Sequence, residues 1–101
     1  MKDAIKAMES KMSPESLRRA HIKAEQDIMA IRLAQLREER NIKQSEMQNF
    51  TQSSVSKIEK RGDIKISTLI DYLDSLGMGL EITAYPKTGV SAAKESVLLK
   101  I

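Results

Sequence analysis

The sequence predicts a small, mostly helical domain that ends in one β-strand. Neither glycine nor proline occurs between Pro14 and Gly62, so helices can run through this part of the chain. Apolar residues there recur at three- and four-residue intervals, which is the period of an amphipathic helix. Residues 80–85 instead alternate apolar and polar side chains, as a strand with one buried face does. We therefore expect about five helices and a single strand.

Length and composition exclude several classes of protein. The chain has 101 residues, enough for one domain with tails and a small core, to which dimerisation would add stability. It contains no cysteine, and its only histidine is His21, so we expect neither a disulfide nor a metal site. No GxxxxGK loop occurs, and no Ser-rich loop lies near His21 in the sequence. We expect no catalytic activity and no cofactor.

The apolar segments are short. None approaches the roughly 20 residues that a membrane-spanning helix needs, and the N-terminal residues interleave charges with Met and Ala. These features predict a soluble, cytoplasmic protein without a secretory signal. The formal net charge is +3, and the excess of cations lies in residues 31–62. A local excess of positive charge is what a nucleic-acid-binding surface requires.

A long helix is predicted over residues 14–40. Ser13 suits the N-cap position and Pro14 the first helical position, and Glu15 follows near the positive end of the helix dipole. A narrow apolar stripe runs along this helix, formed by Leu17, Ala24, Ile28 and Ile31. Two interpretations stay open: the helix binds or braces a partner, or it packs on its own domain.

The part of this helix after Met29 should belong to the core of the domain. Leu33 and Leu36, with Ile42 after the helix, are expected to point inward. The charged residues that follow are expected on a solvated face: Arg37, Glu38, Glu39 and Arg40.

Two short helices with a tight turn at Phe50-Thr51 are predicted next, over residues 44–49 and 52–60. Met47 is the apolar residue of the first helix, and Val55 and Ile58 should both face inward from the second. The other side of the second helix carries amides, hydroxyls and cations: Gln52, Ser53, Ser56, Lys57 and Lys60. Amides and hydroxyls bond base edges, and lysines pair with phosphates, so this face suits a DNA groove. The alternative is a polar solvent face on a small bundle.

A third short helix and the strand follow the loop at Gly62. Ser67 is expected to cap this helix and Gly77 to end it. Its apolar face is expected in the core: Leu69, Tyr72, Leu73 and Leu76. The strand ends before Pro86 and has no evident partner in the sequence, so pairing with a second copy would satisfy its backbone groups. The tail, with apolar residues at 97–99 and 101, is expected to be disordered or docked on a partner.

Three runs of residues carry a resemblance to a known family. They are Val-Ser-Lys-Ile-Glu-Lys-Arg-Gly-Asp at 55–63, Ile-Ser-Thr-Leu at 66–69, and Leu-Gly-Met-Gly-Leu-Glu-Ile at 76–82. Together they resemble the XRE (Cro/repressor-type) helix-turn-helix family, and within it the HigA-like or HipB-like antitoxins, over residues 31–86. The ordered set that matches is Gln44, Gln52, Val55, Ser56, Ile58 and Glu59. Gln44 and Val55 are eleven positions apart, which is shorter than the usual family spacing.

The resemblance implies a lambda-repressor-like helix-turn-helix bundle whose C-terminal strand pairs across a dimer. The expected organisation is an N-terminal helical extension (1–30), a helix-turn-helix domain (31–78), a dimerisation strand (79–86) and a C-terminal tail (87–101). The implied function is a sequence-specific repressor in the bacterial cytoplasm, associated with the nucleoid.

The antitoxin branch further implies direct neutralisation of a toxin and autoregulation of a type II toxin–antitoxin operon. The toxin would be a HigB-type mRNA endonuclease or, second, a HipA-type kinase. The alternative is an interaction protein whose shortened motif no longer binds DNA.

Each expected activity has its own set of residues. Base edges are expected at Gln52 and Ser56, and phosphates at Gln44, Lys57, Lys60 and Arg61. The expected DNA-binding set is Gln44, Gln52, Ser53, Ser54, Ser56, Lys57, Lys60 and Arg61. The expected dimerisation set is Leu80, Ile82 and Ala84, and the expected toxin-binding set is Ile5, Met8, Met12, Leu17 and Ile28.

Overall fold

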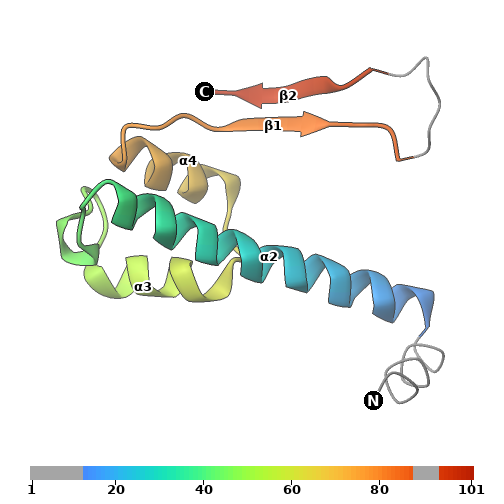
Figure 1. The fold of residues 1–101 in the computed structure, drawn as a ribbon, viewed down its shortest axis with the longest axis horizontal. Coiled ribbons are helices and arrows are strands. Elements are labelled where there is room, and N and C mark those ends of the chain that lie inside the picture. The colour runs from blue at the N-terminus through green and yellow to red at the C-terminus, as the bar shows by residue number, and fades with distance from the viewer. Residues whose placement is uncertain (1–12, 88–93) are drawn as a thin grey trace.

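The computed structural model describes residues 13–87 and 94–101, which form one long helix, two short helices and a two-stranded ribbon (Figure 1). The elements in chain order are α2 (Pro14–Glu39), the 3-10 turn η1 (Gln44–Glu46), α3 (Gln52–Arg61), α4 (Ile66–Ser75), β1 (Glu81–Ala84) and β2 (Ser96–Lys100). No helix within these described ranges is long and apolar enough to cross a membrane.

Helix α2 confirms the long helix predicted from the sequence. The Ser13 Oγ accepts a hydrogen bond from the Ser16 N–H at 3.1 Å, and Pro14 occupies the first turn. The helix ends at Glu39, and Asn41 then adopts a left-handed φ of 57°. Its C-terminal half packs on the other helices, whereas its N-terminal half projects beyond them (Figure 1). The predicted boundary between residues 30 and 31 lies inside this one helix.

The prediction of about five helices was wrong for the described part of the chain, which holds three α-helices. Residues 44–49 form only the single 3-10 turn η1. The Glu46 carboxylate accepts a hydrogen bond from the Lys43 N–H at 3.0 Å, Met47 turns extended (ψ 123°) into the core, and Asn49 adopts φ 65°. The short helix predicted over residues 44–49 is therefore reduced to the three residues Gln44–Glu46.

The start of α4 also differs from the prediction. Lys65, and not Ser67, takes the N-cap position, and no side chain caps the first turn. Ile64 and Leu69 on either side of this first turn pack against the core. The expected end at Gly77 is confirmed, because this glycine adopts a left-handed φ of 72° after the last turn.

The core is small and lies where α2, α3 and α4 meet. Its buried residues are Leu33, Met47, Val55, Ile58, Tyr72, Leu73 and Leu76, all of them predicted to face inward. The Phe50 and Tyr72 rings add an edge-to-face contact with centroids 6.3 Å apart.

The ribbon formed by β1 and β2 corrects the prediction that the strand lacks a partner within the chain. The two strands are antiparallel, Glu81 pairing with Lys100 and Ala84 with Ser96. Leu80 and Ile101 extend the ladder with two backbone hydrogen bonds of 2.9 and 3.0 Å. The tail was not recognised as a strand because an irregularity in the register opposite Ile82 and Thr83 breaks the two-residue alternation. The described end of the tail therefore pairs with the backbone groups along one edge of β1.

Gly62 closes the loop between α3 and α4 directly against α2. Its φ is 65°, and a Cβ placed there would lie 1.9 Å from the backbone oxygen of Gln26. Only a residue without a side chain allows this approach. The contact fixes the C-terminal end of α3 against the middle of α2.

Candidate nucleic-acid interface

Helix α3 presents the side chains that the sequence predicted for DNA. Val55 and Ile58 are buried in the core, so the opposite side of the helix faces solvent. The predicted residues that are exposed are Gln52, Ser53, Lys57, Lys60 and Arg61, and those half-buried are Ser54 and Ser56. The exposed side of α3 therefore combines one amide, hydroxyl groups and three cations.

The N-terminal cap of α3 already uses part of this set. The Thr51 Oγ1 accepts a hydrogen bond from the Ser54 N–H at 3.1 Å and donates one to the Ser54 Oγ at 2.8 Å. It also lies 3.1 Å from the Ser53 Oγ. The hydroxyl of Ser54 thus serves the cap, whereas Ser53 stays exposed. Gln52 and Ser56 remain as the polar side chains of α3 outside the cap.

A buried ion pair attaches α3 to α2. The Arg37 Nε donates to Glu59 Oε2 at 2.9 Å, and its Nη2 donates to Oε1 at 2.8 Å, so the contact is bidentate. The Arg37 Nη1 donates to the Ile42 carbonyl at 2.8 Å. The two side chains are only 9% and 6% exposed. This geometry holds α3 by a pair of parallel, charge-assisted hydrogen bonds.

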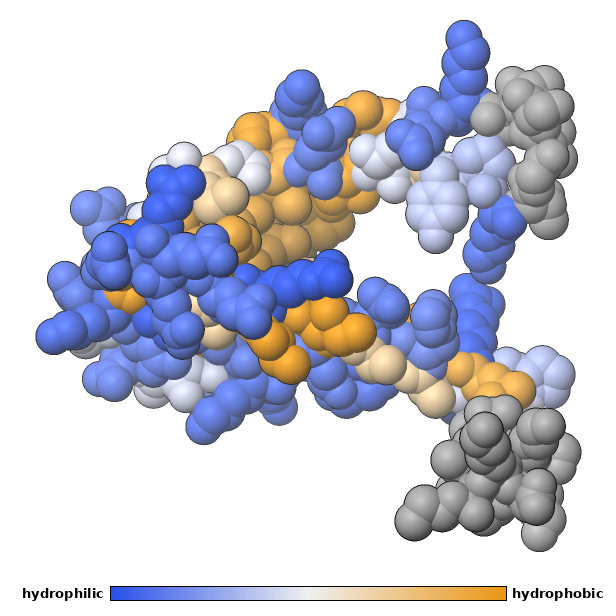
Figure 2. All heavy atoms as spheres, viewed as in Figure 1, coloured by the Kyte–Doolittle hydropathy of each residue, from blue (hydrophilic) through white to orange (hydrophobic). Residues whose placement is uncertain are grey.

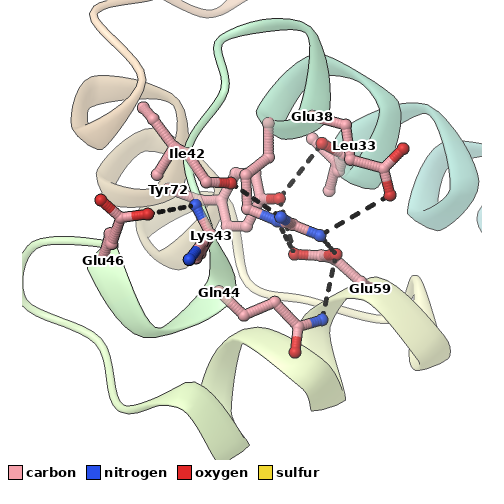
Figure 3. Close-up of polar contacts among 9 residues, drawn as sticks. Leu33, Glu38, Ile42, Lys43, Gln44, Glu46, Glu59 and Tyr72 are labelled. Carbon is pink, nitrogen blue, oxygen red and sulfur yellow. Dashed lines mark hydrogen bonds and ion pairs between the residues drawn. The ribbon is translucent and has the colours of Figure 1, made fainter.

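Two further donors surround the carboxylate of Glu59 (Figure 3). The Tyr72 hydroxyl lies 3.0 Å from Glu59 Oε2 and 3.1 Å from the Leu33 carbonyl, and the Gln44 Nε2 donates to Glu59 Oε1 at 3.3 Å. Burial alone raises the pKa of Glu59, but the hydrogen bonds from Arg37, Tyr72 and Gln44 outweigh it and lower that pKa. Burial, together with the hydrogen bond to Glu59, raises the pKa of the Tyr72 hydroxyl.

One prediction for this region was wrong. Arg37 was expected on a solvated face, but it is buried because it lies on the same side of α2 as Ala30 and Leu33. That spacing was visible in the sequence and was overridden by the run of charges that follows. The phosphate contact expected for Gln44 stays a prediction, and in this structure its amide nitrogen donates to Glu59.

A basic groove lies between the end of α3 and the start of α4. It has a volume of about 300 Å³, and its polar lining consists of Lys57, Arg61, Asp63, Lys65 and Thr68, over Ile58 and Ile64. The sequence missed Lys65 and Thr68, whose only signal was their position at the start of the helix after the motif. The free N–H groups at the N-terminus of α4 add partial positive charge here, which favours an anion such as a phosphate.

The other predicted sites lie away from α3. Among the toxin-binding residues, Leu17 and Ile28 are 40% and 39% exposed on α2, and Ile5, Met8 and Met12 lie outside the described residues. In the dimerisation set, Leu80 and Ile82 are half-buried and Ala84 is exposed on β1.

Comparisons of the chain with protein-family models, with curated proteins and with solved structures gave no match. Any function therefore has to be argued from the geometry of the chain itself.

Proposed function

We propose that this chain is a sequence-specific DNA-binding repressor that reads duplex DNA with the exposed side of α3. The observation that carries the proposal is the continuity of this side with the basic groove. Lys57 and Arg61 belong to both surfaces, so amides, hydroxyls and cations follow one another along a single face. Amides and hydroxyls can bond base edges while cations bind the flanking phosphates.

The attachment of α3 to the body supports the same role. Base recognition requires side chains whose backbone does not shift when DNA binds. The bidentate contact between Arg37 and Glu59 and the close approach of Gly62 to Gln26 hold both the middle and the end of α3. Because η1 is only one turn, these contacts replace much of the support that a longer first motif helix would give.

The wider role that we propose is the antitoxin of a type II toxin–antitoxin operon, which acts as a homodimer and also binds its toxin. The toxin surface would be the N-terminal segment with Leu17 and Ile28 of α2. These two side chains are exposed and lie on the side of α2 away from the core, so a bound toxin would leave α3 free. The interaction protein with a degenerate motif is the second candidate, favoured by the single-turn η1.

A gel shift decides between these candidates. The wild-type protein is titrated, at a stated salt concentration, against a duplex that covers the promoter of its own gene and against a scrambled duplex of equal composition. A repressor retards the promoter duplex at protein concentrations that leave the scrambled duplex free. Retardation of neither duplex would favour the interaction protein, and equal retardation of both would contradict sequence-specific binding.

A further inference from the structure

Helix α2 carries an apolar stripe on the side opposite the core. This outer stripe consists of Leu17, Ala24, Ile28 and Ile31, with Leu17 40%, Ile28 39% and Ile31 57% exposed. On the other side of the same helix, Ala30 and Leu33 are 2% and 4% exposed. Apolar side chains therefore line both sides of α2, and the described residues of the domain cover only one of these sides. Figure 2 shows exposed apolar atoms on the part of α2 that projects beyond the other helices. None of the residues that the structure describes covers this stripe.

We propose that the outer stripe is the contact between two copies of this chain, whose α2 helices pack antiparallel across a two-fold axis. The spacing of the stripe fits such a seam. Together with His21, the residues Leu17, Ala24, Ile28 and Ile31 occupy alternating intervals of four and three, the pattern of a heptad seam. An isologous contact of this kind makes each residue pair occur twice.

One register of the antiparallel pair aligns the apolar residues and the charges together. It places Leu17 opposite Ile28 of the other copy and Ala24 opposite His21, so a small residue lies near the axis. In this register Arg18 flanks the seam beside Glu25 of the other copy, and the opposite charges attract on both sides of the axis. Shifting the partner by one heptad places Glu25 beside a second Glu25, which repels.

The charges of α2 within one chain point to the same residues. Glu15 pairs with Arg19, and Lys23 pairs with Asp27 at 2.6 Å, both within the helix. Neither Arg18 nor Glu25 forms an ion pair with any other residue that the structure describes. They are seven residues apart, about 10 Å along the helix at 1.5 Å per residue, and so cannot pair within one copy. A second copy supplies the opposite charge to each.

This contact leaves the DNA-binding face free. Helix α3 packs on the side of α2 that carries Leu33 and Arg37, which is the side away from the outer stripe. The two-fold axis would relate two recognition helices, as a palindromic site requires. The self-association itself does not depend on the proposed function, and its test contains no DNA.

Sedimentation velocity of the full chain, at concentrations from about 1 to 100 μM, tests the contact. Wild type should sediment as a dimer in the upper part of this range. Ile28→Asp should raise the dimer dissociation constant at least tenfold. The matched control is Ile22→Asp, because Ile22 is 45% exposed on another side of the same helix and should leave the constant unchanged. A wild-type monomer throughout, or equal effects of the two variants, would overturn the proposal.

Charge reversal tests the antiparallel register. Arg18→Glu alone places two carboxylates side by side across the seam and should weaken the dimer about tenfold. The double variant Arg18→Glu with Glu25→Arg restores opposite charges and should return the dimer dissociation constant to the wild-type value. If either side chain only stabilised α2 within one copy, the second change would not restore the dimer. Additive weakening in the double variant would overturn the antiparallel arrangement.

The proposed toxin shares Leu17 and Ile28 with this contact, and the same variants separate the two partners. If Ile28→Asp abolishes binding of a co-expressed toxin but leaves the sedimentation of the protein alone unchanged, the stripe serves the toxin and the self-association is refuted. If wild-type dimers dissociate as toxin is added, the two partners compete for one surface and the self-association stands.

Discussion

At Glu59 the chain buries a carboxylate among three donors that come from α2, α4 and the start of η1. Its position in the sequence, one residue after the buried Ile58, gives no sign of this environment. The contacts with Arg37, Tyr72 and Gln44 explain why one charged side chain can connect three elements. A buried charge that keeps its partners specifies one packing arrangement, whereas a buried charge that loses them is costly.

Replacing Glu59 by Gln should therefore destabilise the domain more than most single changes. The substitution removes the buried counter-charge of Arg37 and leaves only the exposed Glu38, 3.9 Å away; breaking a buried pair costs about 3–5 kcal/mol. Urea denaturation followed by circular dichroism measures the loss. The control is Glu15→Gln, which breaks an exposed pair with Arg19 and should cost less than about 1 kcal/mol. Equal losses in the two variants would show that the buried pair is not important for stability.

The same carboxylate makes the free energy of unfolding depend on pH. Because the pKa of Glu59 in the folded protein lies below its ordinary value of 4.5, the unfolded chain binds this proton first. The stabilisation that Glu59 gives to the folded domain is therefore present above pH 4.5, and it is lost as the pH falls through the lowered pKa of the folded protein. The free energy of unfolding, measured at pH 7, 5 and 3, should fall mainly between pH 5 and pH 3. The decline should be smaller in Glu59→Gln, and an equal decline in both proteins would contradict the assignment.

Gly62 and Gly77 form a matched pair, because they share a backbone conformation but differ in the space around them. Both have a left-handed φ, but a Cβ at Gly62 meets the Gln26 backbone at 1.9 Å, whereas at Gly77 the nearest atom is 4.0 Å away. Gly77→Ala should cost about 1–2 kcal/mol, the conformational penalty alone. Gly62→Ala should cost clearly more, because the loop has to move off α2. Thermal denaturation of both variants checks the difference, and equal melting temperatures would contradict it.

At the scale of elements, the sequence predicted those with strong local signals. The cap at Ser13-Pro14 defined α2, and the spacing of Val55 and Ile58 defined the buried side of α3. The prediction from sequence failed where contacts between distant parts of the chain determine the local structure. The turn η1 is shortened because Met47 enters the core, and β2 forms only because β1 lies beside it. Arg37 is buried by its position on the helix, which its charge concealed.

The exposed side of α3, with Lys60, and the basic groove beside it, with Lys65, yield a prediction for DNA binding. Replacing Lys60 or Lys65 by Ala should weaken binding to all duplexes alike and reduce the slope of log affinity against log salt by about 1. Lys94→Ala is the control, since Lys94 is exposed outside the helical body. Affinities measured by fluorescence anisotropy at several salt concentrations give the slope. An unchanged slope in both variants would exclude phosphate contacts at these lysines.

For the molecule as a whole, the buried side and the exposed side of α3 could be predicted, but the arrangement of partners could not. The sequence identified the exposed side of α3 because an amide, hydroxyls and cations alternate there with the buried Val55 and Ile58. It could not say whether the second apolar stripe of α2 is covered, because apolar residues occur on both sides of that helix. Only the packing of Ala30 and Leu33 shows that the outer stripe is left uncovered.

The proposed function requires that α3 reads base edges through Gln52. The decisive measurement is the affinity of wild type, Gln52→Ala and Gln35→Ala for a duplex selected by the wild-type protein and for its single-base variants, at one salt concentration. Gln35 is an exposed glutamine on α2 and serves as the control. Gln52→Ala should lose about 1–3 kcal/mol, together with the preference at one base pair, whereas Gln35→Ala should match wild type. If Gln52→Ala keeps the affinity and the base preferences of wild type, α3 does not read DNA in this way.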